Sequence, residues 1–191
     1  MHLQKQANNS LIENQSNYRH DNVLNVVAVG SLEKHKQYDQ LILALSQIER
    51  PWKLRLLGDG SQSNNLQELA TQLGVSEKIY FLGRKGNPHP YMQHADVLVL
   101  VSAFEGFPNV VLEALALGTP VVSYNCPGGV SEIMNEELYG LVIAHNDCVA
   151  LTQSLEEFDK GIYNKSLIGS KINERFGLDI IIGQYQSVLT N

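Results

Sequence analysis

The sequence predicts an α/β protein with a mostly parallel sheet of about six strands and helices on both faces. Short apolar runs recur along most of the chain, and each is bounded by glycine, proline or polar turn residues, as buried parallel strands are. Stretches with apolar residues at helical spacing separate many of these runs. This alternation favours parallel pairing, because successive parallel strands need a crossover connection between them.

Two strand–helix units and a third strand are predicted in the first half of the chain. The apolar run 24–29 predicts the first strand. Residues 38–48 then carry apolar side chains at three- and four-residue intervals, which indicates an amphipathic helix. A second strand at 54–57 ends at a glycine, the same helical spacing returns over 66–73, and a third strand lies at 79–82.

The second half of the chain completes the sheet and ends in helices. The run 97–101 is continuously apolar and predicts a buried strand. Residues 110–117 are apolar on almost all sides, which predicts a buried helix. Two further strands are expected at 120–123 and 141–144. From residue 147 the pattern is helical, with segments at 147–158, 165–175 and 178–189.

Composition narrows the functional classes. The chain is 43% apolar and 18% charged, as ordinary globular domains are, and its net charge of −6 argues against a nucleic-acid partner. Cys126 and Cys148 imply no disulfide framework, and the histidines lack metal-ligand spacing, so we expect neither a metal nor a cofactor. No apolar run reaches the length of a membrane span, and the N-terminus lacks the apolar core of a signal peptide. We therefore expect no transmembrane segment and a cytoplasmic location.

The run 58–63 imitates a dinucleotide-binding turn, because it follows a predicted strand and opens a helix. However, Ser63 stands where that fingerprint needs its third glycine, and no clear ribose-binding acid closes the next strand. A tight strand–helix turn explains the run better than a dinucleotide site does.

The most informative stretch is 105–113, Glu-Gly-Phe-Pro-Asn-Val-Val-Leu-Glu. The strand predicted at 97–101 leads into it, so it lies at the carboxyl end of a strand, where parallel α/β sheets bind ligands. The helix that begins there offers N–H groups and a positive dipole end to a phosphate. Glu105 in the turn and Glu113 in the helix are placed to accept hydrogen bonds from hydroxyls. A diphosphate beside hydroxyl-binding carboxylates suits a nucleotide sugar.

Both glutamates also have an ordinary explanation. Acids near helix starts complement the dipole, and solvated acids are common, so a bare Glu-x7-Glu spacing is a weak signal. The intervening residues strengthen it, because the helix over 110–117 is predicted to be buried. A glutamate within a buried helix needs a partner or a ligand, and Glu113 is that glutamate.

The stretch EGFPNVVLEALALGTPVV, followed by CPGGVSEI and YGLVI, resembles the nucleotide-sugar-binding half of group 1 retaining glycosyltransferases of the GT-B fold. The resemblance extends from about residue 23 to at least residue 155 and includes VAVGSLEKHKQYDQLILAL, LRLLGDG, IYFLGR and YMQHADVLVLVS. Several spaced motifs in the right order are specific, although each alone would be weak. The resemblance implies a Rossmann-like donor-binding domain with C-terminal helices over 23–191. It also implies that residues 1–22, rich in Asn and Gln, are a flexible segment or the remnant of an interdomain linker.

The resemblance also implies roles for individual residues. Glu105 matches the acid that contacts the hydroxyls of the donor sugar, and Glu113 matches the acid that accepts from the ribose. Lys36 matches the lysine that neutralises the diphosphate. Glu105 and Lys36 are therefore the implied catalytic residues, and the implied donor-binding residues are Gly30, Arg84, Gly106, Phe107, Asn109, Val110 and Glu113.

Two positions near the lysine depart from the family pattern. Ser31 replaces an arginine, and Gln37 replaces a glycine. Loss of the arginine halves the positive charge expected at the diphosphate. Lys34, Arg84 and Lys85 are candidates to compensate for it.

Length is the most consequential departure, because 191 residues correspond to one of the two α/β domains of family members. We therefore expect the donor-binding half of a retaining glycosyltransferase that uses a nucleoside diphosphate sugar, by default a UDP-sugar, and that is inactive alone. A separate acceptor-binding domain is a candidate partner. The chain would be a fragment, a split-gene half or a degenerate remnant. A non-catalytic nucleotide-binding module, or a partner subunit of a split enzyme, is the alternative, so whether the chain is an enzyme stays open. A sugar epimerase of the same fold fits the motifs less well.

Overall fold

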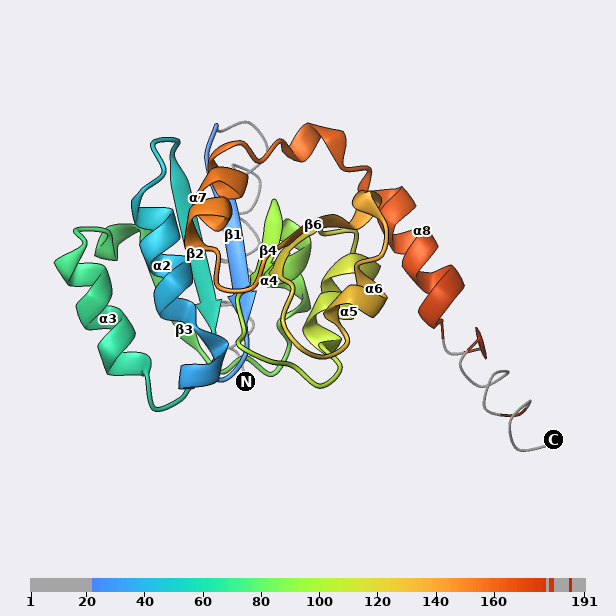
Figure 1. The fold of residues 1–191 in the computed structure, drawn as a ribbon, viewed down its shortest axis with the longest axis horizontal. Helices are drawn as coiled ribbons and strands as arrows, with labels where there is room; N and C mark the ends of the chain where they lie inside the picture. The colour runs from blue at the N-terminus through green and yellow to red at the C-terminus, as the bar shows by residue number, and fades with distance from the viewer. Residues whose placement is uncertain (1–21, 178, 181–185, 187–191) are drawn as a thin grey trace, which may run out of the picture.

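The computed structural model describes residues 22–177, 179–180 and 186, and it contains one six-stranded sheet (Figure 1). All strand pairs are parallel, in the order β3-β2-β1-β4-β5-β6. This confirms the predicted α/β class and all six predicted strands. The strands are β1 (Leu24–Val29), β2 (Trp52–Leu57), β3 (Ile79–Gly83), β4 (Val97–Leu100), β5 (Val121–Tyr124) and β6 (Gly140–Ile143).

Helices connect the strands, as the alternating pattern predicted. Short 3-10 turns occur at η2 (Lys34–Lys36), η3 (Ser76–Lys78), η4 (Glu137–Tyr139) and η5 (Lys160–Ile162). The helix predicted at 178–189 and the segment 1–22 fall almost entirely outside the described residues. The α-helices are α2 (Tyr38–Ser46), α3 (Ser63–Gln72), α4 (His89–His94), α5 (Asn109–Ala116), α6 (Val130–Ile133), α7 (Cys148–Glu156) and α8 (Lys165–Phe176).

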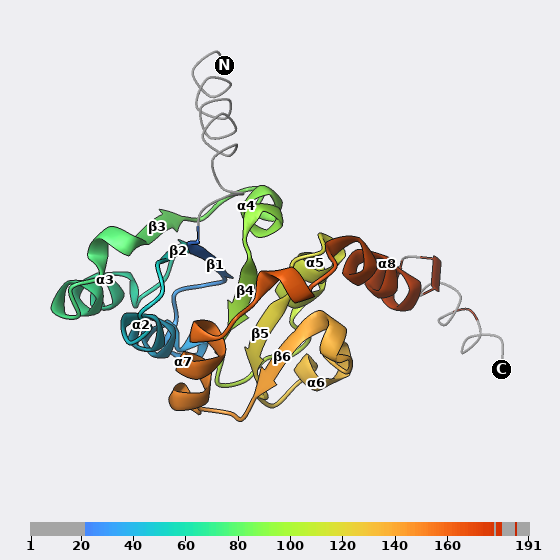
Figure 2. The same ribbon diagram turned by 90° about the horizontal axis from the view of Figure 1, so that it is seen from above.

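The helices form one layer on each face of the sheet. Figure 2 shows α2, α3 and α7 on one side and α4, α5, α6 and α8 on the other. Alternate residues of β1 serve the two layers, since Val26 and Ala28 pack with the first layer and Val27 packs with the second. Apolar burial on both faces explains why the strands read as nearly continuous apolar runs. None of the helices in the described part of the chain is long and apolar enough to cross a membrane.

The strand order positions a ligand crevice. The chain runs outward from β1 to β2 and β3, then returns to place β4 on the other side of β1. Loops that leave the carboxyl ends of β1 and β4 therefore diverge to opposite faces, which opens a crevice between them. In Figure 1 the arrowheads of β1 and β2 point toward the lower edge of the molecule, which is the carboxyl edge of the sheet.

The opposite edge, at the amino ends of the strands, is closed by polar contacts. Asp96 Oδ2 accepts from the backbone N–H of Asn25 at 2.9 Å and from its side-chain amide at 3.2 Å. Lys160 Nζ lies 3.2 Å from Asp96 Oδ1. These bonds join β1, the start of β4 and η5, and give this edge a structural role.

Candidate functional site

Lys36 and Glu105 form an ion pair at the carboxyl edge of the sheet. Lys36 ends η2, in the loop after β1, and Glu105 lies in the loop after β4. The Lys36 Nζ to Glu105 Oε1 distance is 2.7 Å, and the two side chains are only 16% and 12% exposed. The structure therefore brings together the two predicted catalytic residues, which are far apart in the chain.

Ser102 completes this pair and was not predicted from the sequence. Its hydroxyl donates to Glu105 Oε1 at 2.6 Å, and the serine is 1% exposed. Both donors reach the same carboxylate oxygen, and among the described residues no hydrogen bond or ion pair involves Oε2. The only sequence signal that pointed to Ser102 is its place, three residues before Glu105 and at the end of a predicted strand.

Gly30 provides the room in which Lys36 lies. A Cβ at position 30 would sit 2.7 Å from Tyr38 Oη and 3.6 Å from Lys36 Cε. The glycine therefore lets both side chains cross the end of β1. This agrees with the prediction that Gly30 and Lys36 share a site, and it adds Tyr38, which the sequence analysis had placed only in a helix.

Backbone hydrogen bonds lock three loops around the pair. Ala103 N–H donates to the His35 carbonyl at 2.7 Å, which ties the loop after β4 to the loop after β1. Glu105 N–H donates to the Pro127 carbonyl at 3.0 Å, and Gly129 N–H donates to the Gly106 carbonyl at 2.8 Å. The loop after β5 thus supports the turn that carries Glu105.

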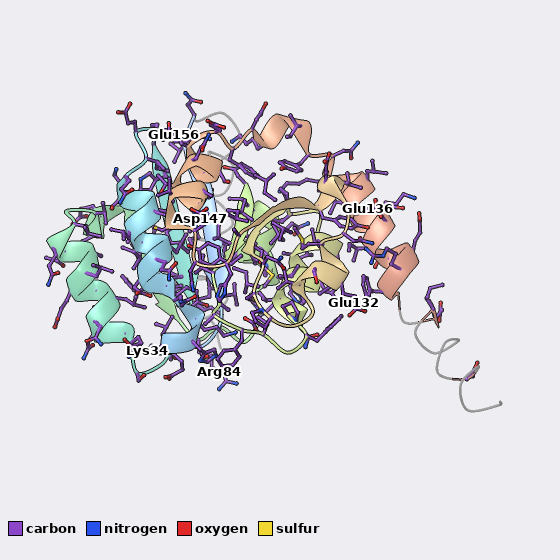
Figure 3. The ribbon with its side chains drawn as sticks, viewed as in Figure 1. Lys34, Arg84, Glu132, Glu136, Asp147 and Glu156 are labelled. Atoms are coloured by element: carbon purple, nitrogen blue, oxygen red, sulfur yellow. The ribbon has the colours of Figure 1, made fainter. Side chains whose placement is uncertain are left out.

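A pocket of about 450 Å³ opens beside the pair. Asp59 fixes its far wall, since its Oδ2 accepts from the Arg84 backbone N–H at 3.1 Å. Figure 3 shows Lys34 and Arg84 at the same end of the molecule, opposite Glu156. The pocket is lined by Val29, Gly30, Ser31, Leu57, Gly58, Asp59, Arg84, Lys85 and Pro88.

Glu113 is placed differently from the expectation. Its side chain is 42% exposed, and its Oε2 lies 3.7 Å from His89 Nε2. The prediction of a helix buried almost all round was wrong, because α5 buries only the face of Val111, Ala114 and Leu115, and Ala116 is exposed. Glu113 instead lies on the open side of α5, near the start of α4.

This position still puts Glu113 close to the pocket. His89 follows directly after Pro88, which is part of the pocket wall. The carboxylate of Glu113 is therefore at the pocket rim and accessible to a ligand.

The turn before α5 presents the remaining predicted residues. Gly106 and Asn109 are exposed, and Asn109 is the first residue of α5, with Val110 next to it. Phe107 is 44% exposed, and its ring packs at 6.2 Å from the ring of Phe176 in α8. The turn is thus held from outside by α8 while its polar face remains open at the carboxyl edge.

The two positions that depart from the family pattern also lie at this site. Ser31 is an exposed residue of the pocket wall. Gln37, which stands where the family has glycine, adopts the left-handed conformation with φ of 50°. That conformation favours glycine, so position 37 is one at which a glycine would be less strained than Gln37.

Burial and the charge of Glu105 shift the pKa values of two side chains near the site. Burial and the negative charge of Glu105 raise the pKa of the Tyr38 hydroxyl above its usual value. Burial, together with Glu105, also raises the pKa of the Cys126 thiol, so this cysteine stays protonated rather than acting as a nucleophile. Among the described residues, no group of three or more His, Cys, Asp or Glu side chains is arranged to hold a metal ion.

Comparison with known proteins gives one family. Residues 11–161 match the family model described as glycosyl transferases group 1. The chain is 32% identical over 160 residues to the lipopolysaccharide core biosynthesis glycosyltransferase LpsE of Rhizobium meliloti, a match that covers 84% of this chain and 45% of LpsE.

Two solved structures extend this similarity to three dimensions. The apo form of the lipopolysaccharide outer core galactosyltransferase WaaB matches with a TM-score of 0.84 and 26% identity, over 90% of this chain and 50% of WaaB. Anabaena Alr3699/HepE in complex with UDP-glucose matches with a TM-score of 0.79 and 26% identity, over 95% of this chain and 52% of that protein. The chain thus spans about half the length of LpsE, WaaB and HepE.

Proposed function

Because this chain belongs to the group 1 glycosyltransferases, we propose that it is the donor-binding half of a retaining enzyme that uses a nucleoside diphosphate sugar. The observation that carries the proposal is the Lys36–Glu105 pair beside a pocket at the carboxyl edge of the sheet. This arrangement offers a cation for the diphosphate and a carboxylate for sugar hydroxyls. The UDP-glucose held by HepE supports a uridine nucleotide as the default donor.

Different residues of the site bind different parts of the donor. Arg84 and the pocket wall face the base, and Glu113 at the rim accepts from the ribose hydroxyls. Gly30 lets the diphosphate approach the end of β1, where Lys36 and the start of α5 at Asn109 and Val110 balance its charge.

Glu105 and Lys36 act on the reacting part of the donor. Glu105, held through Oε1 by Ser102, directs Oε2 toward the sugar. Lys36 stabilises the charge that grows on the departing diphosphate, and such preorganised stabilisation lowers the barrier. The departing phosphate, rather than a side-chain nucleophile, assists the incoming acceptor. Gly106 and Phe107 shape the turn around the sugar.

A non-catalytic nucleotide-binding module, or a partner subunit, is the second candidate. It is favoured by Ser31, which stands on the pocket wall where the family has a cation. The 191 residues supply one wall of a cleft, and transfer needs an acceptor held against the anomeric carbon. We therefore expect negligible glycosyl transfer by this chain alone, without a separate acceptor-binding domain. Sustained product formation from nucleotide sugars, detected by mass spectrometry, would contradict this.

A cytoplasmic location stays a prediction.

Glu113→Gln tests the proposed donor site. The substitution keeps the shape of the side chain and removes its charge, so UDP binding should weaken by roughly 1–3 kcal/mol, because a charged hydrogen-bond acceptor is lost. Calorimetric titration of UDP measures the change.

Glu68→Gln is the matched control, because Glu68 is an exposed glutamate of α3, on the other face of the sheet. It should bind UDP like the unaltered chain. Equal affinities for all three proteins, with UDP bound, would move the ribose away from Glu113. Absence of any UDP binding would refute the proposed function.

A further inference from the structure

The hydroxyl of Tyr38 lies at the candidate site, and no other described residue forms a hydrogen bond with it. Tyr38 begins α2 and is 5% exposed, so it is almost completely enclosed. Among the described residues, no hydrogen bond involves its Oη, and Oη is not one of the fully buried polar atoms that lack a partner. The ring is therefore enclosed while the hydroxyl is reached by solvent, so Oη is available to a ligand.

The position of this hydroxyl points toward the ligand crevice. A Cβ on Gly30 would lie 2.7 Å from Tyr38 Oη and 3.6 Å from Lys36 Cε, so both side chains lie against the same glycine. Gly30 is part of the pocket wall. Tyr38 Oη is therefore a hydrogen-bond donor held at the end of β1, beside the lysine that faces the diphosphate.

We propose that Tyr38 is a further donor-binding residue, whose hydroxyl donates a hydrogen bond to a phosphate oxygen of the bound diphosphate. The inference rests on the proposed function, because it assumes that the diphosphate lies beside Lys36. It supplies a second protein contact near Ser31, a position that offers no cation.

The chemistry of the phenol suits this role. Burial and the Glu105 carboxylate raise the pKa of Tyr38, so the group stays neutral and keeps its proton near neutral pH. A neutral hydroxyl donates to a phosphate without adding a negative charge. Hydrogen bonds to charged groups contribute more than neutral ones do.

Tyr38→Phe tests the inference, because it removes only the hydroxyl. UDP and inorganic pyrophosphate should each bind roughly tenfold more weakly, while uridine binding stays unchanged. Thermal unfolding of the ligand-free variant should not shift to lower temperature, since the hydroxyl has no protein partner to lose. If Tyr38 had only a structural role, Tyr38→Phe would lower the unfolding temperature and leave the affinities for UDP and pyrophosphate unchanged.

Two other tyrosines provide matched controls. Tyr124 Oη donates to Gln40 Oε1 at 2.8 Å, so Tyr124→Phe should lower the unfolding temperature and leave UDP affinity unchanged. Tyr139 Oη is buried with no partner among the described residues, and it lies in η4, away from the pocket. Tyr139→Phe should leave the UDP affinity unchanged and should not lower the unfolding temperature.

The outcomes separate the two claims. The inference is overturned if Tyr38→Phe binds UDP and pyrophosphate like the unaltered chain, or if only UDP-glucose binding changes, which would assign the hydroxyl to the sugar. If the unaltered chain binds pyrophosphate but not UDP, the nucleotide site fails and the pyrophosphate titration still decides the role of Tyr38. If neither ligand binds, both claims fail.

Discussion

Lys36→Ala should reduce the affinity for UDP by roughly ten- to a hundredfold and leave uridine binding nearly unchanged, because a charged donor to the diphosphate is lost. The side chain is only 16% exposed and already lies 2.7 Å from Glu105, so it is held in place before the ligand arrives. Calorimetric titration with UDP and with uridine separates the phosphate contribution from the rest.

The same substitution should also destabilise the ligand-free chain. Glu105 is 12% exposed and, among the described residues, would keep only Ser102 as a side-chain partner, so an enclosed charge loses its counter-charge. We expect a loss of about 1–3 kcal/mol in the free energy of unfolding.

Lys171→Ala is the control for both effects. Lys171 forms an exposed pair with Glu174 at 3.1 Å in α8, and exposed pairs contribute little to stability. It should change neither the unfolding free energy nor the UDP affinity appreciably. Unchanged UDP binding by folded Lys36→Ala would remove the lysine from the diphosphate site.

Gly128→Ala should have the largest effect on stability, a loss of roughly 3 kcal/mol or more. Gly128 has a φ of 125°, and a Cβ there would lie 1.8 Å from the Glu105 carbonyl oxygen. That contact is impossible, so the loop after β5 must move away from the turn that carries Glu105. The Glu105–Pro127 and Gly106–Gly129 backbone bonds would break with it, and UDP binding should fall.

Chemical unfolding measures this loss, with Gly86→Ala as the control. A Cβ at Gly86 meets nothing within 4 Å, and its φ is not in the left-handed region, so that substitution should be nearly neutral. Equal unfolding free energies for Gly128→Ala and Gly86→Ala would show that the two loops do not depend on their close approach.

The fold was predictable because its signal is local. Burial on both faces makes each strand an apolar run, and the predicted strands agree with the observed ones to within a few residues. β2 begins at Trp52 rather than at residue 54, because Lys53 interrupts the apolar run while its backbone still pairs with β1. The helix α4 was not predicted, since six residues are too few for a helical period to register.

The site was predictable only in part. The motif order places Lys36 and Glu105 at one edge of the sheet, and the structure agrees. The exposure of Glu113 and the bond from Ser102 depend on which elements approach each other, which apolar periodicity does not specify. The position of Tyr38 over Gly30 is likewise a tertiary contact.

The central claim is that a nucleoside diphosphate binds at the carboxyl edge of the sheet, and backbone amide chemical shifts during titration with UDP test it most directly. Asn25 and Asp96, which close the opposite edge, should keep their shifts. Large shifts at Asn25 and Asp96, or no shifts anywhere at saturating UDP, would contradict the account. It predicts concentrated changes at Gly30, Lys36, Tyr38, Arg84, Glu105, Val110 and Glu113.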